Sequence, residues 1–297
     1  MRFLQLIVIC LCGSVAAAAC SPIPGAEQLW SRPKLRWLIV GEIHGSNETP
    51  AAFGDLVCDA LEHGKRVTVG LERSSSEQEL LDRVLTDPDS AQAVKELLHR
   101  RDWQEVEDGR SSEAMLHLLL ALRDLHHTHP QLSIFAFDTS TPGDSSAKRD
   151  EAMGKTLLSL RERKPNDLIL VLVGNAHASQ KPVMGLGYDP TAAYLPADER
   201  VSLEARSNGG ESWVQTYVGT NLTCGPTNVG SPSKKRAREI VLDPKLADFG
   251  TVDGILSLGV PTTASAPAAG DPTPLPDCRK QYIATHRSAR GHQPQSK

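Results

Sequence analysis

The stretch that decides the fold is LRWLIVGEIHG, residues 35–45, and LILVLVGNAH at residues 168–177 has the same design. Each begins as a continuous run of apolar, often branched side chains and ends at Gly-x-x-His. Such a run is typical of a parallel strand that is buried on both faces. Ligands of open α/β sheets bind at the carboxyl ends of the strands. We therefore expect His44 and His177 to lie at the same edge of one sheet.

A third apolar run, RVTVGLER at residues 66–73, ends in a carboxylate and a guanidinium. Residues 132–137 predict a further strand, and helical patterns at residues 51–63 and 147–163 separate the strands. Strands that alternate with helices indicate parallel pairing through right-handed crossovers. The sequence therefore predicts an α/β fold with a mostly parallel central sheet and flanking helices.

The predicted α/β domain covers residues 20–260, and an inserted helical segment at residues 77–128 interrupts it. The insertion has apolar residues at helical spacing and no convincing strand. Two alternating segments, 201–206 and 213–218, flank an Asn-Gly-Gly turn and predict a hairpin, after which residues 220–236 are turn-rich.

Two further features are predicted near the C-terminus. Residues 249–258 predict a last edge strand. Residues 261–297 are rich in Pro, Ala and Thr and then polar, which predicts a disordered C-terminal tail.

The N-terminus has the pattern of an export signal. Residues 1–19 combine Met1-Arg2, a short apolar region and a run of small residues, as in a signal peptide. The apolar region is too short for a membrane span. Ala17-Ala18-Ala19-Cys20 also resembles a lipoprotein cleavage box. We expect an exported protein, periplasmic or held at the membrane through a lipid on Cys20.

The cysteines leave two alternatives. Cys20, Cys58, Cys224 and Cys278 remain after cleavage of the predicted signal. If Cys20 is lipidated, one of the other three has no partner; if it is not, two disulfides can form in an oxidising compartment. Cys224 and Cys278 share the Gly/Pro-rich C-terminal region and are the favoured pair. No C-x-x-C occurs, which argues against a thiolate zinc site.

The composition of the chain argues against a nucleic-acid partner. The net charge is −4 and aromatic residues make up 4% of the chain. An acidic chain with few aromatic rings lacks both the basic field and the stacking surfaces that nucleic acids require. We expect no nucleic-acid partner.

Glu42 and His44 are the first candidate catalytic pair. Residues two apart at a strand end point the same way. A carboxylate beside an imidazole binds a divalent metal, or forms a general-base pair in which Glu42 orients His44. The alternative is a structural pair, satisfied by backbone amides and a neighbouring side chain.

Glu72 also ends a buried strand, where an acid is costly unless it is paired. Arg73 is either its partner or a cation that binds an anionic group or stabilises developing negative charge. Asn175 and His177 repeat the spacing of Glu42 and His44. Asp138 follows a strand but is interpreted as a turn former.

A second group of histidines, within residues 126–129, lies at the end of a predicted helix. There their positive charge offsets the helix dipole, so they are not interpreted as metal ligands.

The ordered motifs GEIH at 41–44, VGLE at 69–72 and VGNAH at 173–177 resemble the Tiki/ChaN-like superfamily. This superfamily includes ChaN haem-uptake lipoproteins, the Tiki and TraB proteins, and erythromycin-esterase-like enzymes. The resemblance spans residues 35–260. It implies an α/β core with inserted helices and a site built from Glu42, His44, Glu72 and His177.

Two functional hypotheses follow from this resemblance, and a third reading treats the polar cluster as structural. The first is an exported hydrolase that cleaves a peptide or ester bond of a small-molecule or peptide substrate. Glu42, His44, Glu72 and His177 would hold a divalent metal or act directly on water, helped by Arg73. The alternative is a haem- or iron-binding lipoprotein without catalysis, with Tyr188 and Tyr194 as candidate haem ligands.

Overall fold

A computed structural model of the chain describes residues 20–290, except 231, 233 and 271–273 and the side chains of 285–290. The predicted signal peptide, residues 1–19, and residues 291–297 of the predicted tail lie outside the described residues. Among the residues that are described, no helix is both long and apolar enough to cross a membrane.

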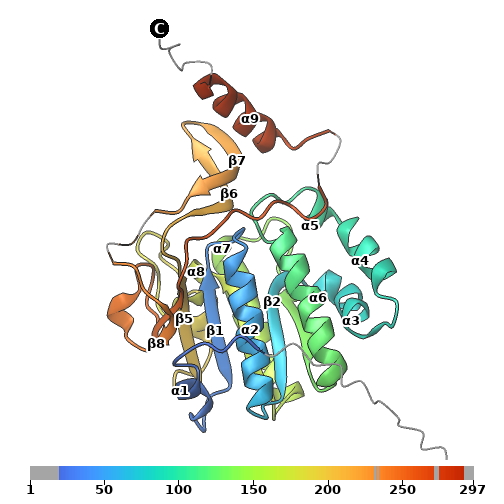
Figure 1. Ribbon diagram of the computed structural model, residues 1–297, viewed down its shortest axis with the longest axis vertical. Coiled ribbons are helices and arrows are strands. Elements are labelled where there is room, and N and C mark those ends of the chain that lie inside the picture. The colour runs from blue at the N-terminus through green and yellow to red at the C-terminus, as the bar shows by residue number, and fades with distance from the viewer. Residues whose placement is uncertain (1–19, 231, 233, 271–273, 291–297) are drawn as a thin grey trace, which may run out of the picture.

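A seven-stranded sheet in the order β3-β2-β4-β1-β5-β9-β8 forms the centre of the fold (Figure 1). All neighbouring strands are parallel except β8, which is antiparallel to β9. The predicted α/β class with a mostly parallel sheet is therefore confirmed. The strands are β1 (Trp37–Glu42), β2 (Val67–Ser74), β3 (Ser133–Asp138), β4 (Leu168–Gly174), β5 (Arg200–Arg206), β8 (Arg238–Val241) and β9 (Gly254–Leu258).

The two Gly-x-x-His strands are direct neighbours. β1 pairs with β4 in a register that places Glu42 opposite Gly174. All residues of β1 are buried, as are all of β4 up to Val173. The continuous apolar runs therefore form central strands, as predicted, and their carboxyl ends lie side by side.

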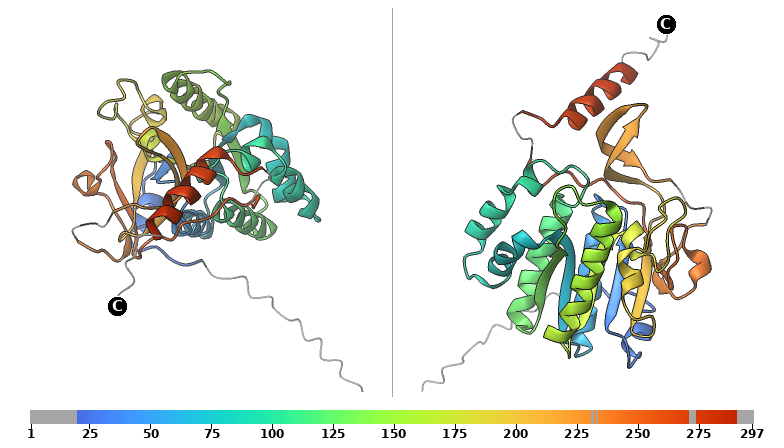
Figure 2. Two further views of the ribbon diagram at one scale, coloured as in Figure 1. Left: turned by 90° about the horizontal axis from the view of Figure 1, so that it is seen from above. Right: turned by 180° about the vertical axis from the view of Figure 1, so that it is seen from behind.

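Helices cover both faces of the sheet (Figures 1 and 2). Leu38 and Val40 of β1 pack into the core layer beneath α2 and α6, whereas Trp37 and Ile39 pack into the layer beneath α7. The helices are α1 (Glu27–Trp30), α2 (Glu48–Glu62), α3 (Gln78–Thr86), α4 (Ala91–Leu98), α5 (Arg101–Gln104), α6 (Glu113–Thr128), α7 (Ser146–Arg163), α8 (Asn175–Ala178) and α9 (Asp277–Arg290). Short 3-10 turns lie at Ser75–Glu77, Thr191–Tyr194 and Pro244–Leu246.

The segment predicted as a helical insertion, residues 77–128, consists of α3, α4, α5 and α6 between β2 and β3. Its last helix, α6, packs on α2 and returns the chain to the sheet. The loop between α5 and α6 leads back to the carboxyl edge, where it enters the candidate site.

The predicted hairpin between 201–206 and 213–218 is wrong. β5 joins the central sheet beside β1, because its apolar residues Val201 and Leu203 are buried there. The second segment, β6 (Glu211–Val218), instead pairs antiparallel with β7 (Asn221–Asn228) in a separate two-stranded sheet. β7 lies in the stretch expected to be turns. The strand predicted at the edge, β9, is not at the edge of the sheet, because β8 pairs with it on its outer side.

The C-terminal segment also differs from the expected disordered tail. The amide of Ser265 donates to the carbonyl of Gly45 at 2.8 Å, and Thr262 and Ser265 are buried. α9 follows and packs on β7 beyond the carboxyl edge of the sheet (Figures 1 and 2). The segment has few large apolar side chains, so its order comes from backbone hydrogen bonds and a disulfide rather than from hydrophobic burial.

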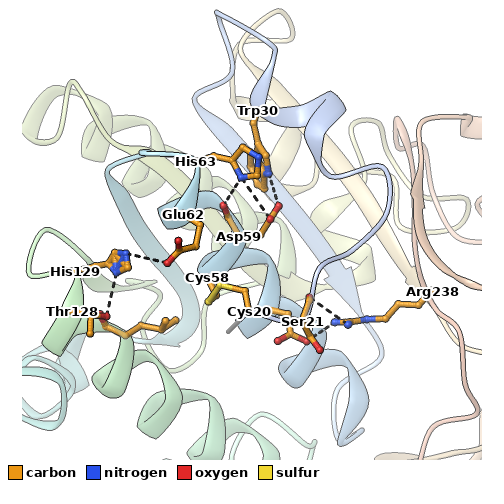
Figure 3. Close-up of a disulfide and its surroundings, with 12 residues drawn as sticks. Cys20, Ser21, Trp30, Cys58, Asp59, Glu62, His63, Thr128, His129 and Arg238 are labelled. Atoms are coloured by element: carbon orange, nitrogen blue, oxygen red, sulfur yellow. Dashed lines mark hydrogen bonds and ion pairs between the residues drawn. A yellow bond between two sulfur atoms is a disulfide. The ribbon is translucent and has the colours of Figure 1, made fainter. Parts of the chain in front are cut away.

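Two disulfides join the four cysteines. The predicted pair Cys224–Cys278 is confirmed and ties β7 to α9. Cys20–Cys58 ties the start of the described chain to α2 (Figure 3). A sulfur atom in a disulfide cannot also form the thioether of a lipid anchor. The structure thus corresponds to the alternative in which all four cysteines pair.

Candidate functional site

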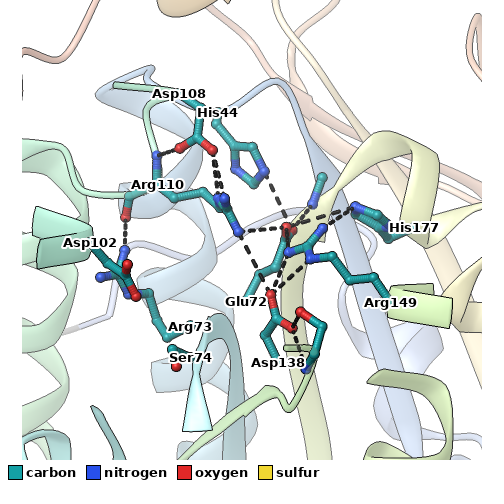
Figure 4. Close-up of polar contacts among 12 residues, drawn as sticks. His44, Glu72, Arg73, Ser74, Asp102, Asp108, Arg110, Asp138, Arg149 and His177 are labelled. Atoms are coloured by element: carbon teal, nitrogen blue, oxygen red, sulfur yellow. Dashed lines mark hydrogen bonds and ion pairs between the residues drawn. The ribbon is translucent and has the colours of Figure 1, made fainter. Parts of the chain in front are cut away.

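The four residues that the motifs predict as a site lie together at the carboxyl edge of the sheet. Glu42 is the last residue of β1, His44 follows it, Glu72 lies near the end of β2, and His177 lies in α8 directly after β4. Both glutamates are buried, and the side chains of His44 and His177 are 18% and 15% exposed. Figure 4 shows His44 and His177 on either side of Glu72.

His44 lies between two carboxylates. Its Nδ1 is 2.9 Å from Oε1 of Glu42 and its Nε2 is 3.4 Å from Oε2 of Glu72. Burial by itself would lower the pKa of His44, but Glu72 and Glu42 outweigh it and raise that pKa to about 10. Both ring nitrogens therefore carry protons at neutral pH, and His44 is a cation rather than a free base.

Each glutamate responds differently to this cation. Burial raises the pKa of Glu42, and its bond to His44 offsets only part of that effect. Burial also raises the pKa of Glu72, but the positive charge of His44 outweighs this effect and holds the pKa of Glu72 well below its ordinary value. Glu72 is therefore the permanent anion at the centre of the site.

His177 has the opposite environment. Its Nδ1 lies 2.7 Å from Oδ1 of the buried Asp150, and Nη1 of Arg149 lies 3.1 Å from its Nε2. A guanidinium has only donors, so Nε2 of His177 accepts this hydrogen bond and carries no proton. The proton is then on Nδ1 and is donated to Asp150. This is the tautomer of a general base oriented by a carboxylate.

The partner of His177 is itself fixed in place. Asp150 lies in the first turns of α7, and the amide and hydroxyl of Thr191 donate to its Oδ1 at 2.7 and 2.8 Å. The carboxylate that orients the ring is therefore held by hydrogen bonds of its own, as a preorganised site requires.

Two arginines that no motif marks complete the site. Nη2 of Arg149 donates to Oε1 of Glu72 at 2.6 Å, and Nη1 of Arg110 donates to the same oxygen at 3.3 Å. The other oxygen, Oε2, accepts from the amide of Gly174 at 2.8 Å. Burial acts to lower the pKa of each arginine, but neighbouring carboxylates raise it, so both stay charged.

Asp138 is part of this network and not only a turn former. Its Oδ1 accepts from the amide and hydroxyl of Ser140, as in a turn, but its Oδ2 accepts from Nε of Arg149 at 2.9 Å. On the other side, Asp108 holds Arg110 through Nε and Nη2 at 2.9 and 2.7 Å. Of these two carboxylates, only Asp138 has a signal in the sequence, because it lies at the end of a predicted strand.

A cavity of about 830 Å³ opens beside Glu72. Its wall combines guanidinium groups with hydroxyl and carboxylate side chains and contains no Phe, Tyr or Trp. The volume falls in the range of small-molecule sites. Neither His44 nor His177 is part of the wall. The lining residues are Glu72–Ser76, 99–102, Val106, Arg110, 138–142 and Arg149.

Comparison with solved structures places this arrangement in a known fold. An erythromycin esterase, an EreC variant in its open conformation, is 12% identical, with 81% of this chain and 93% of the esterase covered and a TM-score of 0.60. A succinoglycan biosynthesis protein is 9% identical over 81% and 91%, with a TM-score of 0.60. A Bacillus cereus protein is 12% identical over 81% and 91%, with a TM-score of 0.51. No protein-family model and no curated protein matches the sequence.

The chain shares its fold with these solved structures. At these identities the likeness shows the fold alone. The shared fold accounts for the common sheet edge, and the contacts of the individual side chains decide what the site can do.

Arg73 does not face Glu72. Its Nε and Nη2 donate to Glu77 at 2.8 Å each, and its Nη1 donates to the carbonyl of Arg110 and the hydroxyl of Ser111 at 2.9 Å. Its guanidinium also lies over the ring of Trp103, 4.5 Å from the centroid. Arg73 is therefore a buried residue that contacts the loop of Arg110, and the guanidinium groups that contact Glu72 are those of Arg110 and Arg149.

Tyr188 and Tyr194 do not join the site residues. Neither lines the cavity beside Glu72. Tyr194 packs instead against Gly154 of α7, where a Cβ atom would lie 2.7 Å from the tyrosine side chain. Haem ligation by these tyrosines gains no support from this arrangement.

The residues present do not fit a divalent metal. Both nitrogens of His44 already face carboxylates, and Oε1 of Glu72 already accepts from two guanidinium groups. Two fixed positive charges beside Glu72 would repel a dication. Among the described residues, no group of three or more His, Cys, Asp or Glu side chains has the arrangement of a metal site.

Proposed function

We propose that this chain is a hydrolase that cleaves an ester bond of a small-molecule substrate by general acid–base catalysis. One observation carries the proposal: two histidines at one sheet edge have opposite hydrogen-bond environments. His44 lies between carboxylates and is a cation, whereas His177 has an unprotonated Nε2. Titratable groups whose environments push their protonation states apart are typical of an acid and base pair. The esterase among the structural neighbours supports the choice of ester.

His177 is the base in this mechanism. Its Nε2 takes a proton from a water molecule while the water oxygen forms a bond to the acyl carbon of the ester. Asp150, which is 1% exposed, stabilises the resulting imidazolium through Nδ1. A general base that is positioned in this way contributes roughly 10²–10⁴-fold to the rate.

His44 is the acid. When the tetrahedral intermediate breaks down, the bond from the acyl carbon to the alkoxy oxygen breaks, and His44 gives that oxygen a proton. The charged groups of Arg110 and His44 stabilise the oxyanion that forms in between. Solvent then restores the proton of His44 and removes the one on His177, so that ester and water yield a carboxylic acid and an alcohol.

We also propose that the hydrolase is exported. Residues 1–19 have the pattern of a signal peptide, and a chain with two disulfides suits an oxidising compartment.

The test is a screen of p-nitrophenyl acyl esters and lactones, with a peptide panel in parallel because the motifs leave both bond types open. We expect turnover of an ester that falls 10²–10⁴-fold in His177→Asn and in His44→Gln. His127→Asn is the matched control, because His127 is exposed at the end of α6. Full activity of His177→Asn on a substrate of the wild type would overturn the mechanism.

A further inference from the structure

The base of the proposed mechanism, His177, has no free ring nitrogen in this structure. Nε2 of His177 accepts a hydrogen bond from Nη1 of Arg149 at 3.1 Å, and Nδ1 is engaged by Asp150. Both ring nitrogens are thus satisfied, and no lone pair is available for the proton of a water molecule. Arg149 has to move off Nε2 before His177 acts.

The same arginine lines the cavity. Arg149 reaches three partners: Asp138 through Nε, Glu72 through Nη2 and His177 through Nη1. Two of them are anionic and one is a neutral ring nitrogen. The bonds to the two carboxylates gain the attraction between opposite charges, which the bond to the neutral ring nitrogen lacks. The bond to His177 is therefore the one that a ligand in the cavity replaces most easily.

The chemistry of Arg149 determines what such a ligand is. A guanidinium offers only donors, so the ligand must be an acceptor, and an anionic acceptor binds a guanidinium more strongly than a neutral one does. Arg110 lies beside Arg149 on the same oxygen of Glu72 and also lines the cavity. The hydroxyl groups of Ser74, Ser75 and Ser76 also line the cavity.

We propose that the substrate carries an oxyanion group (carboxylate, phosphate or sulfate) that binds Arg149 and Arg110 in this cavity and draws Arg149 away from Nε2 of His177. Substrate binding then uncovers the base. The inference rests on the proposed function, since it assigns the substrate class and the activation step of the same site.

The first experiment measures binding without turnover. Protein labelled with ¹⁵N is titrated with sodium sulfate, and in separate titrations with phosphate and acetate, at fixed pH and ionic strength. The signal is the Nε2 resonance of His177. We expect a saturable shift in the wild type and none in Arg149→Met. No shift in the wild type, or an equal shift in Arg149→Met, would overturn the inference.

Two further variants show whether a lost response comes from the missing guanidinium or from a damaged fold. Arg161→Met is the matched control, because Arg161 lies on the same helix, α7, and pairs with Glu199 away from the cavity. Arg161→Met should keep the wild-type shift. Arg149→Lys keeps the charge and should retain a weaker response, with a dissociation constant raised by about tenfold. If Arg149→Met does not fold, Arg149→Lys decides: an unchanged dissociation constant contradicts the inference.

The second experiment compares two esters that differ only in a free or a methylated carboxylate. We expect kcat/KM to favour the anionic ester at least tenfold in the wild type, and the preference to shrink in Arg149→Lys and to disappear in Arg149→Met. Equal turnover of both esters would refute the substrate class while leaving the hydrolase intact. If no ester is cleaved but sulfate still shifts His177, the proposed function fails and the anion site stands.

Discussion

Glu107 and Arg279 form a buried ion pair in which Nη2 of Arg279 donates to Oε1 of Glu107 at 2.7 Å. Their side chains are 2% and 6% exposed. Glu107 lies in the loop between α5 and α6 that also carries Asp108 and Arg110, and Arg279 lies in α9, beside the Cys224–Cys278 disulfide. The C-terminal helix is therefore joined to the loop that delivers an arginine to the candidate site.

Breaking this pair should destabilise the protein strongly. Arg279→Met leaves Glu107 as a buried charge, and removing one partner of a buried pair costs about 3–5 kcal/mol. Urea unfolding, followed by circular dichroism, measures the change in the free energy of unfolding. Lys280→Met is the control, because Lys280 pairs with Asp277 at the surface and such pairs contribute about 0–1 kcal/mol. Equal stability of the two variants would mean that α9 does not support the loop.

Asp150→Asn should lower kcat without unfolding the chain. The amide keeps the shape of the carboxylate, and its oxygen can still accept from Thr191 and from Nδ1 of His177, but the neutral group no longer stabilises the imidazolium. We expect a loss of roughly 10²–10⁴-fold in kcat on any ester that the wild type cleaves, with a KM changed far less. A loss confined to KM would assign Asp150 to substrate binding instead.

The stability of the protein should fall in alkali because of His44. Its pKa is raised from 6.5 to about 10 on folding. The stabilisation from a raised pKa is fully present below the unfolded value and disappears as pH rises through the folded value. The free energy of unfolding of the wild type, relative to that of His44→Gln, should thus fall by an amount on the order of a few kcal/mol as the pH rises from 6.5 to 10. Urea unfolding at pH 6, 8 and 10 measures this, and a constant difference would contradict the raised pKa.

Gly109 is needed where two loops of the site meet. It has a φ of +90°, and a Cβ atom there would lie 2.4 Å from the amide nitrogen of Gly45. Gly109→Ala should displace the loop of Arg110 and reduce both stability and activity. Gly143→Ala isolates the effect of φ, since Gly143 has a φ of +95° but no atom within 4 Å of the added Cβ. Thermal unfolding of both variants should show the larger loss in Gly109→Ala.

The disulfide of Cys20 gives a prediction about the N-terminus. With Cys20–Cys58 and Cys224–Cys278 formed, the protein should contain no reactive thiol at these positions after unfolding without reductant. Alkylation followed by intact-mass measurement tests this. A free thiol at Cys58 would contradict the Cys20–Cys58 disulfide, and a diacylglycerol mass on Cys20 would show that Cys20 carries a lipid anchor instead.

The sequence alone was enough to predict the central strands and the shared edge. Continuous apolar runs specify buried parallel strands, and parallel neighbours bring their carboxyl ends together regardless of what lies between them. Glu42, His44, Glu72 and His177 could therefore be predicted from local patterns.

Only the tertiary structure decided the partners of those residues. Arg110 comes from a loop and Arg149 from a helix start, and no local pattern tells which strand end such a segment will reach. Arg73 pairs with Glu77 four residues away rather than with its neighbour Glu72. The tail is ordered by backbone hydrogen bonds and the Cys224–Cys278 disulfide, neither of which leaves a hydrophobic pattern in the sequence. The charge state of each histidine follows from these contacts, because it depends on which groups surround the ring rather than on the motif that carries it.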